Sequence, residues 1–225
     1  EQWTAGTQGH VDVSYINGAD DAKLNSLTVS DPYSSATNAA FIDHMNLYKW
    51  NAHFNPDLQS LALPFTFEYT THKGGPTSWV SYNTSGMTTA NTFDITPVPA
   101  GSDGEWRWDG STRLDIGSGD YITGWRLTVK ADGGKGIPSG AEIKTWQTYD
   151  ASYRLQYDKT STGQAPTTVD GLQQIDLTNT VDVTGVTNEA SPVTLTDKDS
   201  TKVIIRDAVP LQTLVRPPAN VTLSG

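Results

Sequence analysis

The strongest indication of fold in this sequence is the stretch Leu61-Ala62-Leu63-Pro64-Phe65-Thr66-Phe67-Glu68-Tyr69. Every second side chain in it is large and apolar, which is the period of a β-strand with one buried face. Pro64 favours an edge position or the start of a strand, because proline has no N–H to donate to a neighbour. We therefore predict a strand here, with Glu68 pointing away from the apolar face.

A second stretch, Asn46 to Phe54, alternates in the same way and places Tyr48, Trp50 and Ala52 on one face with Phe54. Shorter alternating runs follow along the chain, most of them bounded by turn-forming pairs such as Asn-Gly and Asp-Gly. No stretch sustains a 3.6-residue period, although a helical turn or two fits residues 38–44. The pattern predicts an all-β fold, an antiparallel β-sandwich or jelly-roll-like domain.

The composition excludes several classes of protein. The chain has 225 residues, a net charge of −10 and no cysteine, so disulfides, thiolate metal sites and cysteine nucleophiles are excluded. Basic residues are not clustered, which makes nucleic acid and anionic membrane surfaces poor partners. No apolar stretch is long enough for membrane insertion. Charged residues make up only 18% while the chain has 31 threonines, a balance that favours solvent-exposed strands and an extracellular, secreted protein.

The composition changes along the chain, which bears on the domain organisation. All seven tryptophans precede Asp158, and Thr, Val and Asp dominate after it. We interpret residues 1–165 as an aromatic-rich β-sandwich and residues 166–216 as a Thr/Val-rich β segment of the same domain, because about sixty residues are few for an independent core. A second small β module is the alternative. Residues 217–225, which begin with Pro-Pro, read as a linker toward a further module of a longer modular chain.

The most conspicuous aromatic cluster is Glu105-Trp106-Arg107-Trp108-Asp109. If it is a strand, the two indoles share one face, where they either pack in the core or form a platform for a ligand. As candidate ligand-binding residues we select Trp106, Trp108 and Asp109 of this cluster, together with Trp79 and Tyr82.

Acidic turns provide the carboxylate and carbonyl oxygens that Ca²⁺ prefers. Asp115 and Asp120 bracket one such loop, and Asp197 and Asp199 flank a lysine in another. Neither matches the EF-hand pattern, so Ca²⁺ is a possible cofactor on composition alone.

Catalytic motifs are scarce. The sequence has no G-x-S-x-G nucleophile elbow and no Walker or dinucleotide-binding loop. Glu68 and Glu105 are flanked by aromatic residues and could serve as the paired acids of a glycosidase, but alternation turns Glu68 away from its aromatic neighbours. We expect the protein not to be an enzyme.

One short segment carries a resemblance. Trp125 and Leu127, in Ile122-Thr123-Gly124-Trp125-Arg126-Leu127, resemble the first W-x-L strand of a family of Gram-positive cell-surface β-domains that bind the cell wall. That family has a second W-x-L near its C-terminus, which this chain lacks. More broadly, the Cys-free, Thr-rich composition resembles β-sandwich modules of Gram-positive surface adhesins and pilins, which often carry isopeptide bonds formed by a lysine.

These observations lead to one expected function and two alternatives. The expected function is a non-enzymatic extracellular surface module that mediates adhesion or ligand binding, as part of a pilus, fibre or stalk. Its partner would be an extracellular protein or a glycan. The first alternative is a carbohydrate-binding module or lectin that uses exposed Trp and Tyr side chains, and the second is a jelly-roll glycosidase.

Overall fold

The computed structural model describes residues 2–4, 7–18, 22–31, 41–42, 44–95, 97–98, 107–109, 113–115, 122–151 and 167–206. Within them the elements are β1 (Gln2–Thr4), β2 (Gln8–Ile16), β3 (Leu24–Asp31), β4 (Met45–Phe54), α2 (Pro56–Leu61), β5 (Phe65–Thr71), β6 (Val80–Tyr82), β7 (Phe93–Ile95), β8 (Pro97–Val98), β9 (Arg107–Asp109), β10 (Arg113–Asp115), β11 (Ile122–Lys130), β12 (Glu142–Ala151), β13 (Thr167–Val169), β14 (Leu172–Thr187) and β15 (Thr194–Arg206).

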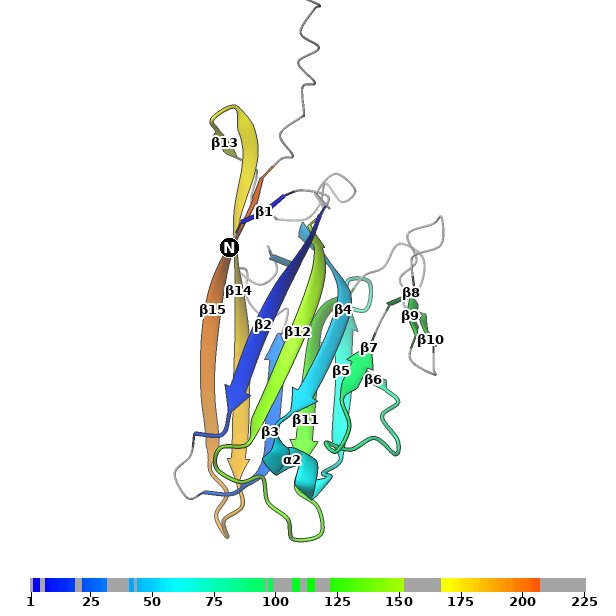
Figure 1. Cartoon of the computed structure of the whole chain (residues 1–225), viewed down its shortest axis with the longest axis vertical. Helices are drawn as coiled ribbons and strands as arrows, with labels where there is room; N and C mark the ends of the chain where they lie inside the picture. The colour runs from blue at the N-terminus through cyan, green and yellow to red at the C-terminus, as the bar shows by residue number, and fades with distance from the viewer. Residues whose placement is uncertain are drawn as a thin grey trace, which may run out of the picture.

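Two sheets packed face to face form the body of the molecule (Figure 1). The main sheet has the strand order β1-β15-β14-β3-β11-β5-β6, with β13 paired to β14, and the second sheet has the order β2-β12-β4-β7. Their pairs are antiparallel apart from β1, which runs parallel to β15. The predicted all-β sandwich is therefore confirmed. Strands β8, β9 and β10 form a small third sheet.

The core lies between the two sheets and is rich in aromatic rings. Trp50 of β4 lies 4.5 Å from Phe67 of β5 and 5.0 Å from Trp125 of β11, measured between ring centroids. The alternation in β5 is as predicted, because Phe65 and Phe67 are buried while Glu68 lies on the other face. In β4 every second residue from Trp50 to Phe54 is buried, but nearer the start of the strand the buried residue is Leu47. The change occurs where the register with β12 shifts.

The start of β5 differs from the sequence prediction. Residues Pro56–Leu61 form the helix α2, and β5 begins only at Phe65. The side chain of Asn55 accepts a hydrogen bond from the Leu58 N–H, which caps the helix, and Ala62 ends it in the left-handed conformation. Leu61 is therefore the last residue of the helix, and Leu63 lies between the helix and β5, although their spacing matches that of the strand. In the range 38–44, Phe41, Ile42 and His44 are helical, and the remainder lies outside the described residues.

The outer face of the main sheet explains part of the threonine content. At one register five strands each contribute a threonine to a continuous row, in which Thr28 and Thr128 are joined by a hydroxyl–hydroxyl hydrogen bond of 2.9 Å. The full row is Thr196, Thr184, Thr28, Thr128 and Thr66. β-Branched side chains pack well side by side on a pleated surface, so threonine suits a sheet face that meets solvent.

The C-terminal part of the described chain belongs to the main sheet. β14 pairs with β3 on one side and with β15 on the other, and β3 pairs in turn with β11. A two-residue turn at Asp170-Gly171, with both residues at positive φ, joins β13 to β14. Residues 217–225, interpreted as a linker, lie outside the described residues. No helix in the described part is long and apolar enough to cross a membrane.

Candidate functional site

β2 of the second sheet and β15 of the main sheet lie along the same side of the sandwich (Figure 1), and hollows lined by residues of both strands open this side. β2 is the last strand of the second sheet, and β15 is followed in the main sheet only by the short β1. β1 pairs with Ile204–Arg206, the last three residues of β15. Within the described residues, the stretch Thr194–Val203 therefore has no strand on its outer edge. Unpaired strand edges expose backbone N–H and C=O groups that can pair with another chain.

β1 closes the upper end of this opening. Its Trp3 is buried, stacks on Tyr149 with a centroid distance of 6.4 Å, and meets Phe41 edge-on. The indole also covers Gly9 of β2, where a Cβ atom would lie 2.2 Å from the ring. β1 therefore pairs with the edge of one sheet while its tryptophan fills the space beside the other.

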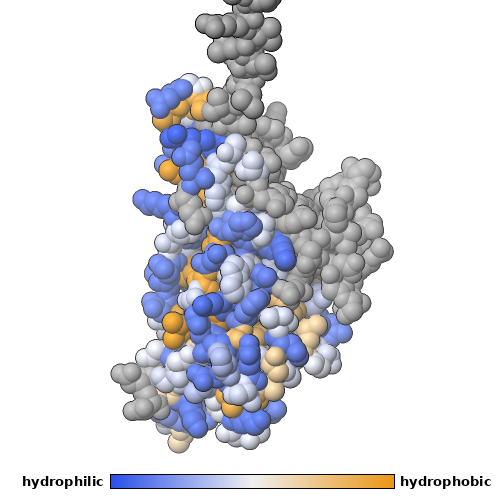
Figure 2. All heavy atoms as spheres, in the orientation of Figure 1, coloured by the Kyte–Doolittle hydropathy of each residue, from blue (hydrophilic) through white to orange (hydrophobic). Residues whose placement is uncertain are grey.

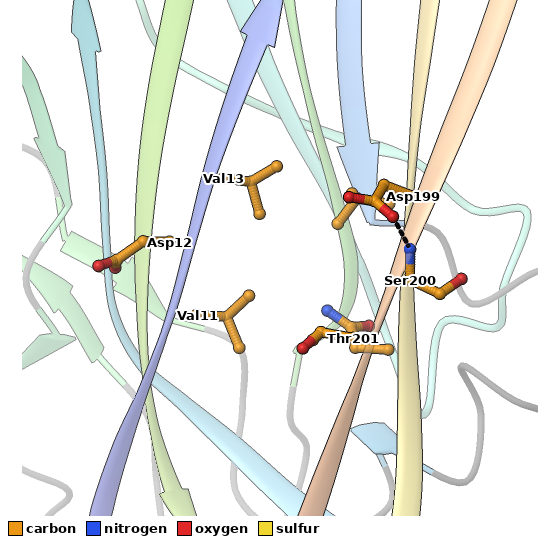
Figure 3. Close-up of a pocket in the computed structure, with 8 residues that line it drawn as sticks. Val11, Asp12, Val13, Asp199, Ser200 and Thr201 are labelled. Carbon is orange, nitrogen blue, oxygen red and sulfur yellow. Dashed lines mark hydrogen bonds between the residues drawn. The ribbon is translucent and has the colours of Figure 1, made fainter. Parts of the chain in front are cut away.

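Below β1 the opening is a groove with two hollows, which we call the edge groove. The first has a cavity volume of about 220 Å³ and the second about 350 Å³. Figure 3 shows Val11 and Val13 pointing from β2 into the first hollow, while Asp12 points away from it. Its lining comprises Val11, Asp12, Val13, Asn179, Val181, Asp199, Ser200 and Thr201. The second hollow is lined by Ile16, Asn17, Gly18, Leu24, Leu27, Val183, Gly185, Leu195, Thr196 and Asp197.

Apolar side chains are exposed at the lower end of the edge groove. Ile16 is 58% exposed and Leu195 41% exposed, and both line the second hollow, while Val193 just before β15 is 50% exposed. Figure 2 shows hydrophobic atoms between hydrophilic ones along this side of the molecule. Exposed apolar groups beside free strand edges are typical of interaction sites.

The β15 wall of the edge groove is acidic. Asp197 and Asp199 are in phase with Val203 and Ile205, which are buried further along the same strand. Each carboxylate accepts a hydrogen bond from the next backbone N–H, at 2.8 Å for Asp197 and 2.7 Å for Asp199. Among the described residues neither hollow is lined by a lysine or arginine, so this part of the groove presents negative charge together with apolar surface.

A buried polar cluster lies behind the first hollow. Asn179 donates a hydrogen bond from Nδ2 to Oδ2 of Asp31 over 2.8 Å, and the Tyr149 hydroxyl approaches the same oxygen at 3.4 Å. Burial raises the pKa of Asp31, the two hydrogen bonds lower it, and the nearby Asp182 raises it by a smaller amount, so that the resulting pKa is about 7. Burial also raises the pKa of the Tyr149 phenol. Among the described residues, the buried atoms Oδ1 of Asn179 and Oδ1 of Asp31 have no hydrogen-bond partner.

The two acidic segments predicted to bind Ca²⁺ are only partly described by the structure. Asp197 and Asp199 lie on β15, beside the edge groove. Asp115 ends β10 and its side chain is not described, and Asp120 lies outside the described residues. Within the described part of the chain no group of three or more His, Asp or Glu side chains could hold a metal ion.

The predicted aromatic ligand-binding residues lie elsewhere. Tyr82 is only 5% exposed and packs against Phe93 with a centroid distance of 5.8 Å, so its ring contributes to the core. The half-buried Trp79 stacks on the guanidinium of Arg126, 4.1 Å from its ring centroid. Trp108 and Asp109 belong to β9, with side chains that are not described, and Trp106 lies outside the described residues.

The structure also describes Glu68, a candidate catalytic acid, and Lys144, a lysine that an isopeptide bond could use. Glu68 accepts a hydrogen bond from Nε of Arg126 at 2.6 Å, in a partly exposed ion pair on the outer face of the main sheet. Lys144, which a lysine cross-link would require to be buried, is exposed and lies 3.7 Å from Glu142.

The sequence reasoning missed the edge groove and the Asn179–Asp31 contact. A signal for Asn179 was present, because it stands at an inward position in the alternating run of Ile175, Leu177 and Val181. A polar residue in the buried phase of a strand indicates a buried hydrogen bond or a site.

Comparisons with known proteins do not assign a family. No protein-family model matches the chain, and neither does any curated protein. Among solved structures, the CFA/I adhesin CfaE of enterotoxigenic E. coli aligns over 90% of this chain with 8% sequence identity and a TM-score of 0.16. The chain spans 40% of the length of that adhesin.

Proposed function

We propose that this chain is a non-enzymatic, extracellular ligand-binding module of a cell-surface protein, and that it mediates adhesion through the edge groove. The observation that carries the proposal is the edge groove itself. Within the described residues it combines strand edges that have no strand partner with exposed apolar side chains and two aspartates on one side of the sandwich.

The energetics of such a surface support a binding role. An exposed strand edge with apolar neighbours can pair with another chain, and charged side chains limit such pairing to suitable partners. On β15 these charges are Asp197, Lys198 and Asp199. A ligand that covers Ile16 and Leu195 would remove exposed apolar surface from water, which favours the bound state.

The surface location rests on composition. A fold of this size without cysteine needs no reducing compartment, and a row of threonines that includes Thr66, Thr28 and Thr196 lies on the outer face of the main sheet. The non-enzymatic assignment rests on the environment of Glu68, whose carboxylate is held by Arg126 on the outer face of the main sheet, away from the edge groove.

The test is adhesion of fluorescent beads coated with the folded chain to a panel of bacterial and epithelial cells. We expect the beads to attach, and attachment to fall when Ile16→Lys and Leu195→Lys are combined. Both side chains are already exposed, so the fold should be retained. Val80→Lys is the matched control, because Val80 is 45% exposed on β6, away from the groove.

Two results would contradict the proposal. One is the absence of attachment to every cell type in the panel. The other is attachment that survives the groove variant and is lost with Trp79→Ala, since binding would then lie on the outer face around Arg126.

A further inference from the structure

The edge groove also indicates what kind of ligand it takes, an inference that rests on the proposed function. We infer that it binds an extended peptide segment of a partner protein, which adds as a strand to the edge of β15 that has no strand partner among the described residues, and places a lysine or arginine side chain in the first hollow, beside Asp199.

The chain itself provides an example of this binding mode. β1 pairs in parallel with Ile204–Arg206 and inserts Trp3 between the two sheets. The edge of β15 continues below β1 as Thr194–Val203, without a strand partner among the described residues. A segment in line with β1 would therefore meet the continuing edge of β15 and the same gap between the sheets. It would compete with the carboxylates of Asp197 and Asp199 for the N–H groups of Lys198 and Ser200.

The size of the groove sets the length of the segment. From Thr201, at the first hollow, to Leu195, at the second, β15 advances about 20 Å at roughly 3.3 Å per residue. About six or seven residues of an extended peptide would cover this distance. Alternate side chains of the peptide would point between the sheets, with the period at which Thr201, Asp199 and Asp197 follow one another.

The negative charge of the edge groove favours a cationic side chain at the inward positions of the peptide. Asp197 lines the second hollow and Asp199 the first, and both carboxylates are on exposed residues of β15. None of the residues lining either hollow is cationic. Lys198 occupies the opposite phase of β15 and so belongs to its outer face.

The walls suit the aliphatic part of a long cationic side chain. Val11 and Val13 from β2 and Val181 from β14 line the first hollow, and Figure 3 shows the two β2 valines directed into it. Lysine and arginine bury their methylene stems against apolar surface and keep the charged end near polar groups. An ammonium group at the end of such a stem could pair with the carboxylate of Asp199, which lines the same hollow.

The direct test uses a blocked synthetic peptide, Thr-Val-Thr-Lys-Thr-Lys-Thr-Val, and its charge-reversed counterpart with Glu in place of Lys. Binding to the intact chain is measured by fluorescence anisotropy at low salt. We expect the Lys peptide to bind and the Glu peptide to show no binding. Equal binding of the two peptides, or no binding of either, would overturn the inference.

Variants locate the binding site. Asp197→Asn combined with Asp199→Asn keeps both backbone caps but removes two charges, and should weaken binding of the Lys peptide by roughly 2- to 10-fold, the range for one or two exposed charge pairs. The matched control combines Asp57→Asn with Glu189→Gln, two exposed acids outside the lining of the groove. If both pairs of substitutions weaken binding of the Lys peptide equally, the peptide is attracted by negative charge in general, and the edge groove is not its binding site.

Strand addition has its own readout. A Lys peptide that is N-methylated at alternate residues keeps its charges but loses half of its backbone donors, and we expect one of the two methylation phases to abolish binding. Binding that is insensitive to both phases would overturn strand addition. Dimerisation of the chain that Ile16→Lys abolishes and the Lys peptide does not compete for would make a second copy the occupant, and would likewise overturn the inference.

The outcomes separate this inference from the proposed function. If beads adhere in a groove-dependent manner but the Lys peptide does not bind, the groove is an adhesion site for another class of ligand. If neither adhesion nor peptide binding depends on the groove residues, both proposals are wrong.

Discussion

Replacing the buried Asp31 by asparagine should make the protein more stable at neutral pH and remove a large part of its pH dependence. Asp31 is fully buried at the end of β3, and one of its two carboxylate oxygens has no partner in the described structure. Asparagine has nearly the same shape, and its oxygen can still accept the bonds from Asn179 and Tyr149.

The magnitude follows from the pKa of Asp31. The folded protein holds this pKa at about 7, against a reference value of 3.8 for the unfolded chain. Between pH 4 and pH 7 the folded state therefore keeps a proton that the unfolded state has released, so stability declines as the pH rises through this window. A difference of about three units, at about 1.4 kcal/mol each, corresponds to a loss of about 4 kcal/mol that is complete above pH 7.

The assay is urea unfolding at half-unit steps from pH 4 to pH 8, followed by tryptophan fluorescence. We expect the Asp31→Asn variant to equal or fall slightly below the wild-type stability at pH 4 and to exceed it at pH 8. The difference in unfolding free energy should grow across the window by up to about 4 kcal/mol. Asp12→Asn, which alters an exposed carboxyl group on β2, serves as the control and should leave the wild-type pH profile in place.

A constant difference between wild type and Asp31→Asn from pH 4 to pH 8 would refute the reasoning. So would a variant that is less stable than wild type at pH 8. Either result would mean that the carboxylate is stabilised in the folded protein by contacts stronger than those of Asn179 and Tyr149.

Three further substitutions test other parts of the structure. Gly9→Ala should destabilise the fold by about 1–3 kcal/mol or more in urea unfolding, because its Cβ would meet the Trp3 ring, whereas Gly18→Ala, with no atom within 4 Å of the added Cβ, should have little effect; equal effects would contradict the packing of β1. Ala62→Gly should raise stability by about 0.5–1 kcal/mol, because Ala62 ends α2 with a φ of 51°, and a loss of stability would contradict that conformation. Glu68→Gln should cost less than about 1 kcal/mol and lose its effect at high salt, because the ion pair with Arg126 is partly exposed; a cost that salt does not change would argue for a buried contact.

The strands could be predicted because their signal is local. In β5 the apolar side chains recur at every second residue, and Phe65 and Phe67 are buried as that period requires. The helix α2 escaped prediction although it has a capping residue in Asn55 and a proline in its first turn, since the apolar spacing of Leu61 and Leu63 continues into the strand that follows. At the end of this short helix the apolar side chains happen to recur at every second residue, as they do in a strand. The sequence alone therefore does not distinguish the helix end from an extension of the strand.

The candidate site was predicted only in fragments. Asp197 and Asp199 were selected for calcium, yet in the structure they lie on the wall of the edge groove, and what they would bind depends on what faces them. Their neighbours across the groove, Val11 and Val13, belong to a strand near the other end of the chain. No spacing in the sequence relates these two pairs.

The sequence by itself determined that this is an all-β protein with one apolar face on each main strand, because side-chain direction in a strand depends only on backbone geometry. The tertiary structure decided which strand edges remain unpaired and which polar groups meet. Asn179 and Asp31 are 148 residues apart, and β1 pairs with residues about two hundred positions later. Such contacts arise from the packing of the whole core, so the edge groove exists only once both sheets have closed around it.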